Sequence, residues 1–123
     1  MYSNKSTAGK HLICDFTDVK SFDIDFKEIC HSLCHSHGFK ILGEVEHRFE
    51  PEGYTFLFLL SESHLSVHTF PERKYLSFDL YTCRDYTDNS TYTDIFEWLK
   101  EKFHAKGSYQ IIDRRFTQTI SYN

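Results

Sequence analysis

The run from Ser61 to Glu72 is the part of this chain richest in side chains that could do covalent chemistry. Its twelve residues hold two carboxylates, three serine hydroxyls and two imidazoles, and they directly follow the apolar run Phe56–Leu60. A hydroxyl beside a general base can act as a nucleophile, and an imidazole is the side chain most often used as that base. Ser63 and His68 are therefore a candidate reactive pair, although a serine and a histidine on one strand in most proteins simply face the solvent.

A second cluster, Cys30–His37, holds two cysteines and three histidines and invites a metal assignment. The cysteines lie one helical turn apart, as do two of the histidines, but a helix cannot turn all of these side chains toward one ion. No second pair of cysteine and histidine follows at the spacing of a zinc finger. The cluster also overlaps a stripe of apolar residues at helical spacing, made by Phe26, Ile29, Cys30 and Leu33. We therefore expect no metal site.

Runs of apolar residues predict the strands that must position the reactive run. His64–Phe70 alternates, with both histidines on one face and Leu65, Val67 and Thr69 on the other. Before it, Tyr54–Leu60 is rich in Phe and Leu and is typical of a strand buried on both faces. After it, Tyr75–Cys83 alternates again, with an apolar face made by Leu76, Phe78 and Leu80.

Two helices are predicted on either side of these strands. Asp25 and Glu28 resemble a capping box at the start of the first helix, and Gly38 is a natural C-terminal stop. Apolar residues at helical spacing from Tyr92 to Phe103 predict the second helix, which should end near Gly107. Three further strands are predicted at Leu12–Phe16, Phe39–His47 and Tyr109–Phe116.

The order of strand, helix, four strands, helix and strand predicts an α+β fold. Short connections between the central strands favour an antiparallel sheet, so we expect a two-layer sandwich with two helices on one face. The opposite face would carry His68, Phe70, Tyr81 and Cys83, a mixture too apolar to lie comfortably in water. We therefore expect a second copy of the chain to cover that face, which makes the protein a homodimer.

Length and composition narrow the class of protein further. A chain of 123 residues suits one domain, residues 1–123, with one hydrophobic core. The net charge is −4 and no run of five or more Lys and Arg occurs, so we expect no nucleic-acid partner. Met1–Lys10 lacks the apolar stretch of a signal peptide, and no apolar run reaches the roughly 20 residues that span a bilayer. We expect a cytoplasmic protein without a membrane partner, its four cysteines reduced.

Four motifs resemble those of the bacterial S-adenosylmethionine decarboxylases, namely Gly9–Leu12, His47–Phe49, Ser61–Glu72 and Phe78–Cys83. Their order and spacing agree with the family across nearly the whole chain. The resemblance implies a proenzyme that cuts itself between Glu62 and Ser63 into residues 1–62 and 63–123. Ser63 would attack the carbonyl of Glu62 to give an ester, and β-elimination followed by hydrolysis would turn the serine into a pyruvoyl group.

The resemblance also implies roles for residues around the cleavage point. His68 would be the base that acts in processing. Thr55 stands where the family has a serine, so a hydroxyl donor for the reaction intermediate is kept. Cys83 matches the family's proton donor in decarboxylation, and a thiol can be tuned toward neutral pH for that task.

Substrate-binding roles fall to three further positions. Phe49 and Phe70 would stack on the adenine or pack against the sulfonium, and Glu72 would accept hydrogen bonds from the ribose. The pyruvoyl group would form a Schiff base with the substrate and act as the electron sink, with no metal and no pyridoxal phosphate. The resemblance thus implies a homodimeric enzyme that decarboxylates S-adenosylmethionine for the synthesis of polyamines such as spermidine.

Three positions depart from the family pattern near the expected pocket. Arg84 stands where the family commonly has glycine, and it places a long cation next to Cys83 in the sequence. Phe70 replaces a frequent tryptophan, and Phe56 replaces a small residue. Two alternatives therefore stay open: a pyruvoyl-dependent decarboxylase of ornithine or arginine, and an uncleaved, inactive homologue that binds a partner.

Overall fold

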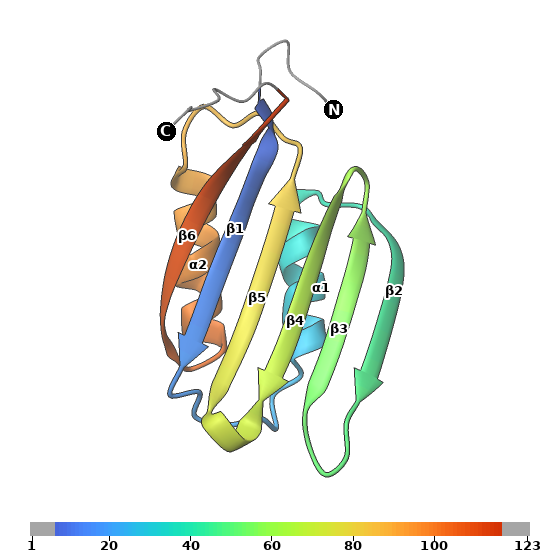
Figure 1. The fold of residues 1–123 in the computed structure, drawn as a ribbon, viewed down its shortest axis with the longest axis vertical. Coiled ribbons are helices and arrows are strands. Elements are labelled where there is room, and N and C mark those ends of the chain that lie inside the picture. The colour runs from blue at the N-terminus through green and yellow to red at the C-terminus, as the bar shows by residue number, and fades with distance from the viewer. Residues whose placement is uncertain (1–6, 117–123) are drawn as a thin grey trace, which may run out of the picture.

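Six strands form one antiparallel sheet, and two helices cover one of its faces (Figure 1). The computed structural model describes residues 7–116. In chain order the elements are β1 (Thr7–Thr17), α1 (Phe26–His37), β2 (Ile41–Arg48), β3 (Tyr54–Leu60), β4 (Ser63–Phe70), the 3₁₀ turn η1 (Pro71–Arg73), β5 (Tyr75–Thr82), α2 (Ser90–Lys102) and β6 (Lys106–Arg115). The strands lie in the order β2-β3-β4-β5-β1-β6, and every neighbouring pair is antiparallel. The predicted α+β sandwich is confirmed.

Helix α1 begins and ends where its capping residues predict. The Asp25 carboxylate accepts a hydrogen bond from the Glu28 backbone N–H at 3.0 Å, which satisfies one of the unpaired donors of the first turn. Gly38 adopts the left-handed conformation, with φ of 68°, and ends the helix. The N–H of Phe39 then donates to the Cys34 carbonyl at 2.8 Å, so β2 starts at Ile41 and not at Phe39 as expected.

The core lies between the sheet and the helices. The alternation in the sequence correctly predicts which side chains of β4 and β5 belong to it. The apolar faces of β4 and β5 are buried, including Leu65, Val67, Leu76, Phe78 and Leu80. They pack in one cluster with the apolar stripes of both helices, among them Leu33, Tyr92 and Leu99. Phe56, which departs from the family pattern, is fully buried and fills part of this core. Successive side chains of a strand point to opposite faces of the sheet. The face that the helices cover is therefore buried, and the other face is open.

The expectation that Tyr54–Leu60 is buried on both faces is wrong for the single chain. Leu57 is 41% exposed and Leu59 is 58% exposed, while Phe56, Phe58 and Leu60 are buried. The helices cover only one face of the sheet (Figure 1). The burial pattern of β3 shows that every second side chain points away from the core. The open face of the sheet is therefore more apolar than alternation in the neighbouring strands would predict.

Several boundaries also differ from the sequence prediction. Strand β1 is longer than the predicted Leu12–Phe16, because both of its neighbours, β5 and β6, pair with it along its length. Helix α2 ends at Lys102, before the expected stop near Gly107, and the chain enters β6 at Lys106.

Residues 1–6, which belong to the polar segment Met1–Lys10, and residues 117–123 lie outside the described part of the chain. Between residues 7 and 116, neither helix is long and apolar enough to cross a membrane.

The two ends of the sheet carry different loops. Figure 1 shows the β3–β4 turn, the C-terminal end of β5 and the end of α1 together at one end of the sheet. The β2–β3 loop and η1 lie at the opposite end. Because β4 runs from one end to the other, residues that are close in its sequence can belong to different ends of the molecule.

Candidate active site

The turn between β3 and β4 holds the bond that is expected to break. Leu60 pairs with Ser63, so Ser61 and Glu62 form the turn itself. The backbone of Glu62 lies in the left-handed region, with φ of 60°. For a residue with a Cβ atom this conformation costs roughly 1 kcal/mol, and such strain commonly marks functional turns. The N–H of Ser61 donates to the Lys40 carbonyl at 3.2 Å and ties the turn to the segment that precedes β2.

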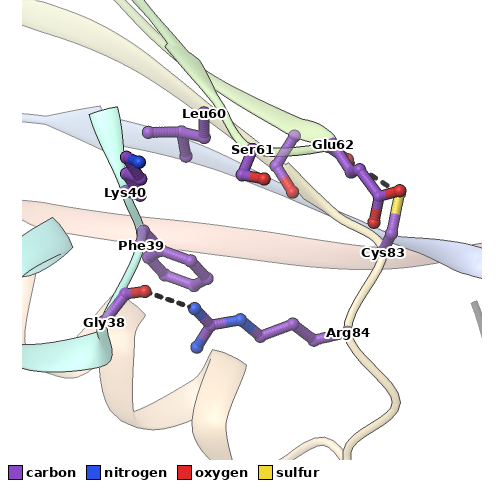
Figure 2. A pocket seen from close by; sticks show the side chains of 9 residues that line it. Gly38, Phe39, Lys40, Leu60, Ser61, Glu62, Cys83 and Arg84 are labelled. Atoms are coloured by element: carbon purple, nitrogen blue, oxygen red, sulfur yellow. Dashed lines mark hydrogen bonds between the residues drawn. The ribbon is translucent and has the colours of Figure 1, made fainter. Parts of the chain in front are cut away.

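The thiol of Cys83 lies on the carbonyl group of Glu62. Its Sγ is 2.7 Å from the Glu62 oxygen, to which it donates (Figure 2). The sheet register explains the contact: His64 pairs with Tyr81, and two further steps along the ladder bring Glu62 opposite Cys83. The carbonyl that Ser63 would attack is therefore the one that the thiol touches, and a donor at this oxygen can stabilise the negative charge that develops there.

Cys83 differs from the other cysteines in exposure. All four cysteines lie within residues 7–116, and three of them, Cys14, Cys30 and Cys34, are buried while Cys83 is half-buried. Burial raises the pKa of Cys14 and of Cys30, and it raises the pKa of Cys34 to about 12. A buried thiol held in its protonated form is a poor nucleophile. Cys83 is therefore the most accessible of the four thiols.

A cavity of about 460 Å³ opens beside the turn. Residues 60–63 of the turn form one wall, Cys83 and Arg84 form a second, and the segment Gly38–Lys40 after α1 forms a third (Figure 2). The sequence predicts Phe39 and Lys40 as part of a strand and not of the site, because no chemical motif marks them. The arrangement gives Ser63, the precursor of the expected pyruvoyl group, open space for a small ligand.

His68 and Thr55 lie together, at the other end of the sheet. Thr55 Oγ1 and His68 Nδ1 are 3.0 Å apart on the paired strands β3 and β4. They line a second cavity of about 280 Å³ together with the three residues expected to bind substrate, Phe49, Phe70 and Glu72. The phenyl rings are half exposed, 50% for Phe49 and 41% for Phe70. Five of the predicted site residues are thus brought to one cavity.

A single chain does not bring His68 to Ser63. The two residues are five positions apart on one strand, which amounts to about 17 Å at about 3.4 Å per residue. They also differ in direction, since Ser63 shares its face with the buried Leu65 and His68 points to the open face. The predicted residues therefore fall into two groups, one around Ser63 and Cys83 and one around His68.

Charged and polar side chains occupy the centre of the open face between these two groups. Ser66 donates to Asp79 at 3.4 Å, and His11 Nε2 lies 3.3 Å from the same carboxylate, near enough for an ion pair although not aligned as a hydrogen bond. The ring of His64 lies 6.0 Å from that of His11. Burial, and next the neighbouring His11, lower the pKa of His64. A neutral imidazole costs less to bury than a charged one.

The Cys30–His37 cluster contributes to folding. Cys30 and Cys34 are buried in the core, and His31 Nε2 pairs with the Glu44 carboxylate at 3.0 Å. Across residues 7–116, no three His, Cys, Asp or Glu side chains gather in a way that could hold a metal ion. Cys30, Cys34 and His31 thus have structural partners within the chain.

Comparison with known proteins identifies similar chains. The family model described as S-adenosylmethionine decarboxylase matches residues 10–115. The S-adenosylmethionine decarboxylase proenzyme of Prochlorococcus marinus (strain MIT 9313) is 36% identical over 107 residues, which cover 83% of this chain and 86% of the relative. That of Synechococcus sp. (strain WH7803) is 39% identical over 83 residues, 64% of this chain and 65% of the relative, so this match spans just under two thirds of its length.

A solved structure shares the fold. The crystal structure of the adenosylmethionine decarboxylase from Aquifex aeolicus VF5 superposes with a TM-score of 0.77 and 23% sequence identity. The match covers 97% of this chain and all of that chain. At this identity the likeness establishes the arrangement of the sheet and helices.

Proposed function

The chain belongs to the S-adenosylmethionine decarboxylase family, and on that premise we propose that it decarboxylates S-adenosylmethionine after cutting its own backbone between Glu62 and Ser63. The observation that carries the proposal is the contact between the Cys83 thiol and the Glu62 carbonyl at 2.7 Å, in a turn where Glu62 has a positive φ. A strained peptide bond with a donor on its oxygen is prepared for attack by the neighbouring hydroxyl.

Self-cleavage follows from these positions. The Ser63 hydroxyl adds to the Glu62 carbonyl carbon, and the thiol donates to the oxygen as it becomes negative. The C–N bond then breaks and leaves an ester between the two residues. A base removes the Cα proton of Ser63, the Glu62 carboxylate departs and dehydroalanine remains. Its imine form takes up water and releases ammonia, which leaves a ketone on the new amino terminus at residue 63.

The site fits the pyruvoyl group that this sequence of steps would produce. Residue 63 lines a cavity of about 460 Å³, and Cys83 stands beside it. When present, the pyruvoyl group supplies a carbonyl that accepts the electron pair left behind by carbon dioxide. The chain's own residues would hold the substrate and move protons. The Cys83 thiol is placed to return a proton to the substrate α-carbon.

A second copy of the chain completes the site. The base His68 lies about 17 Å from Ser63 in its own chain, too far for proton transfer. The open face carries exposed apolar side chains that a partner would cover, among them Val45, Leu57, Leu59 and Ile112. Two copies can stack their open faces about a two-fold axis that lies between the two sheets and runs across the strands. Each end of one sheet then faces the opposite end of the other. His68 of the partner subunit then lies at the end of the sheet that holds Ser63 and Cys83.

The same stacking assembles the substrate pocket. It brings the cavity lined by Phe49, Phe70 and Glu72 of one copy toward the cavity at Ser63 of the other. The rings offer apolar and π surfaces to an adenine and a sulfonium, and the carboxylate offers acceptors to ribose hydroxyls. Thr55 Oγ1 engages Nδ1 of His68, so Nε2 is the nitrogen that serves in proton transfer.

The comparisons favour this substrate over the alternatives. The relatives are named for S-adenosylmethionine, and their names as proenzymes agree with processing. We therefore do not favour ornithine or arginine as the substrate, nor an uncleaved, inactive homologue. As an enzyme that supplies aminopropyl groups to polyamine synthesis, the protein would work in the cytoplasm.

Release of carbon dioxide tests the proposal. Purified protein should release carbon dioxide from carboxyl-labelled S-adenosylmethionine and not from ornithine or arginine, and treatment with sodium borohydride in the presence of substrate should abolish the activity. Ser63→Ala, which cannot form the ketone, is the matched control and should be inactive. Release from ornithine or arginine alone, or equal activity of Ser63→Ala, would overturn the proposal.

A further inference from the structure

Arg84 lines the Ser63 cavity, and several contacts hold its side chain in place. Its guanidinium donates to two successive backbone carbonyls at the end of α1, to His37 at 2.5 Å and to Gly38 at 2.6 Å. Figure 2 shows the bond to Gly38. The guanidinium carbon also lies 4.2 Å from the centre of the Phe39 ring. A planar group with donors on two edges and an aromatic ring on its face is a geometry that arginine can form and lysine cannot.

These contacts turn the charge of Arg84 away from Cys83. Although the two residues are neighbours in sequence, the guanidinium faces the C-terminal end of α1, where unpaired carbonyls and the helix dipole favour a cation. The concern that Arg84 places its charge beside the thiol is therefore not borne out by the structure. The side chain instead ties the segment after β5 to the end of the helix.

Strand pairing alone does not hold the backbone on both sides of Cys83. Strand β5 ends at Thr82, so strand pairing fixes the backbone only up to the residue before the thiol. On that side Gly9 packs against the chain so closely that a Cβ atom there would lie 2.1 Å from the Thr82 carbonyl oxygen. On the other side, beyond Cys83, the chain leaves the sheet for the loop to α2. Arg84 is the first residue after Cys83, and its contacts with the end of α1 hold the start of this loop.

We infer that Arg84 is a positioning residue, which keeps the Cys83 thiol on the Glu62 carbonyl by tying the start of the β5–α2 loop to the end of α1. The inference rests on the proposed function for its kinetic consequence, because the thiol is placed to act first at the carbonyl of Glu62 and later at the substrate carbon. Its structural consequence, restricted motion of the thiol, does not depend on any activity.

Alkylation of Cys83 measures the structural consequence directly. Folded Ser63→Ala protein, which stays uncut whether or not the native chain cleaves, is treated with iodoacetamide, and the modified cysteine is located by peptide mass spectrometry. The other three cysteines are buried, so the signal comes from Cys83. Adding Arg84→Met should raise the alkylation rate several-fold. Adding Arg84→Lys should raise it nearly as much, because an ammonium cannot bridge both carbonyls and stack on Phe39. Lys20→Met removes an exposed cation elsewhere and should leave the rate unchanged.

Kinetics of the otherwise native protein measure the functional consequence. We expect Arg84→Met and Arg84→Lys to slow self-cleavage and to lower kcat by about tenfold, with KM changed less than about threefold, because a misplaced proton donor affects the chemical step. Thermal unfolding is recorded for each variant, and if Arg84→Met does not fold, Arg84→Lys decides.

The outcomes separate the two proposals. Wild-type alkylation and wild-type rates in both Arg84 variants would overturn the positioning role. Slow reaction in Arg84→Met with full recovery in Arg84→Lys would overturn it as well, because charge alone would then suffice. If the native protein neither cleaves nor decarboxylates while the alkylation rates still rise, the proposed function fails and the positioning role stands.

Discussion

At the scale of single residues, the chemistry of this chain depends on one carbonyl group and what touches it. Glu62 contributes a strained backbone, Ser63 the neighbouring hydroxyl and Cys83 a thiol 2.7 Å from the oxygen. The same thiol is placed to serve twice, first as a donor to the carbonyl in self-cleavage and then as a proton donor to the substrate. These two uses can be separated by substitution, because one needs only a hydrogen bond and the other needs an acid.

Cys83→Ala should still cleave but about tenfold more slowly, since a thiol is a weaker donor than the groups whose loss from an oxyanion site costs a hundredfold or more. Decarboxylation by the cleaved variant should fall at least about a hundredfold, the usual contribution of a positioned general acid. Intact mass against time gives the first rate and carbon dioxide release gives the second.

The matched control is Cys83→Ser, which restores a hydrogen-bond donor without restoring a group that gives up its proton near neutral pH. It should cleave faster than Cys83→Ala and remain a poor decarboxylase. Undiminished turnover in Cys83→Ala would remove the thiol from the decarboxylation step.

At the scale of secondary structure elements, sequence patterns predict the features that depend on interactions between residues near in sequence. The caps at Asp25 and Gly38 and the alternation in β4 and β5 are local, and the structure agrees with both. The exposure of Leu57 and Leu59 on β3 could not be predicted in this way, because it depends on which faces the helices leave open. The meeting of Cys83 and Glu62 depends likewise on strand order and register, which no local pattern contains.

An ion-pair network joins α1 to β2 and gives the fold a dependence on pH. Lys27 Nζ lies 3.0 Å from the Glu44 carboxylate and 2.8 Å from that of Glu46. Hydrogen bonds from Lys27 lower the pKa of both carboxyl groups below the ordinary value of 4.5. Because the folded-state pKa is below that of the unfolded chain, this stabilisation is present above about pH 4.5 and is lost as the pH falls through the lowered pKa.

Lys27→Met should therefore make the fold less sensitive to acid. The free energy of unfolding, measured with urea, should fall less between pH 6 and pH 3 in this variant than in the native protein, and the difference should shrink in 0.5 M salt, which screens exposed pairs (about 4–5 Å Debye length). Lys20→Met, which removes an exposed cation outside the network, should retain the native slope. If the free energy of unfolding of Lys27→Met falls with pH as steeply as that of the native protein, Lys27 does not stabilise the charged carboxylates.

At the scale of the whole molecule, the candidate site is divided between the two ends of the sheet. The sequence places Ser63 and His68 within one short run, and that proximity led us to expect one constellation of residues. A strand converts the same five positions into about 17 Å, so what is close in the sequence of β4 is distant in space. The alternation also indicates which polar and apolar residues share the open face, and from them the sequence predicts that a second copy covers it; this stays a prediction.

Mixed dimers test whether the site is shared between copies. Ser63→Ala lacks the nucleophile and His68→Ala lacks the base, so each alone should not be processed promptly. When the two variants are co-expressed, a mixed dimer contains one site with Ser63 from one chain and His68 from the other. About half of the His68→Ala chains should then be cleaved, since random pairing places half of them in mixed dimers.

Two controls accompany this experiment. Chains that carry both substitutions lack both groups and should restore cleavage to neither single variant. Leu59→Asp, which puts a charge on the open face, should weaken pairing and abolish the recovery. Absence of cleavage in dimers shown to be mixed would place the whole reaction within one chain.

The most direct measurement is the intact mass of freshly purified native protein, compared with that of Ser63→Ala. We expect two fragments, residues 1–62 and a fragment that begins at residue 63 with a pyruvoyl group in place of serine, and we expect one full-length chain for the variant. A folded native protein that shows only the full-length mass, with an ordinary serine at position 63, would contradict the central claim that this chain makes its own catalytic carbonyl.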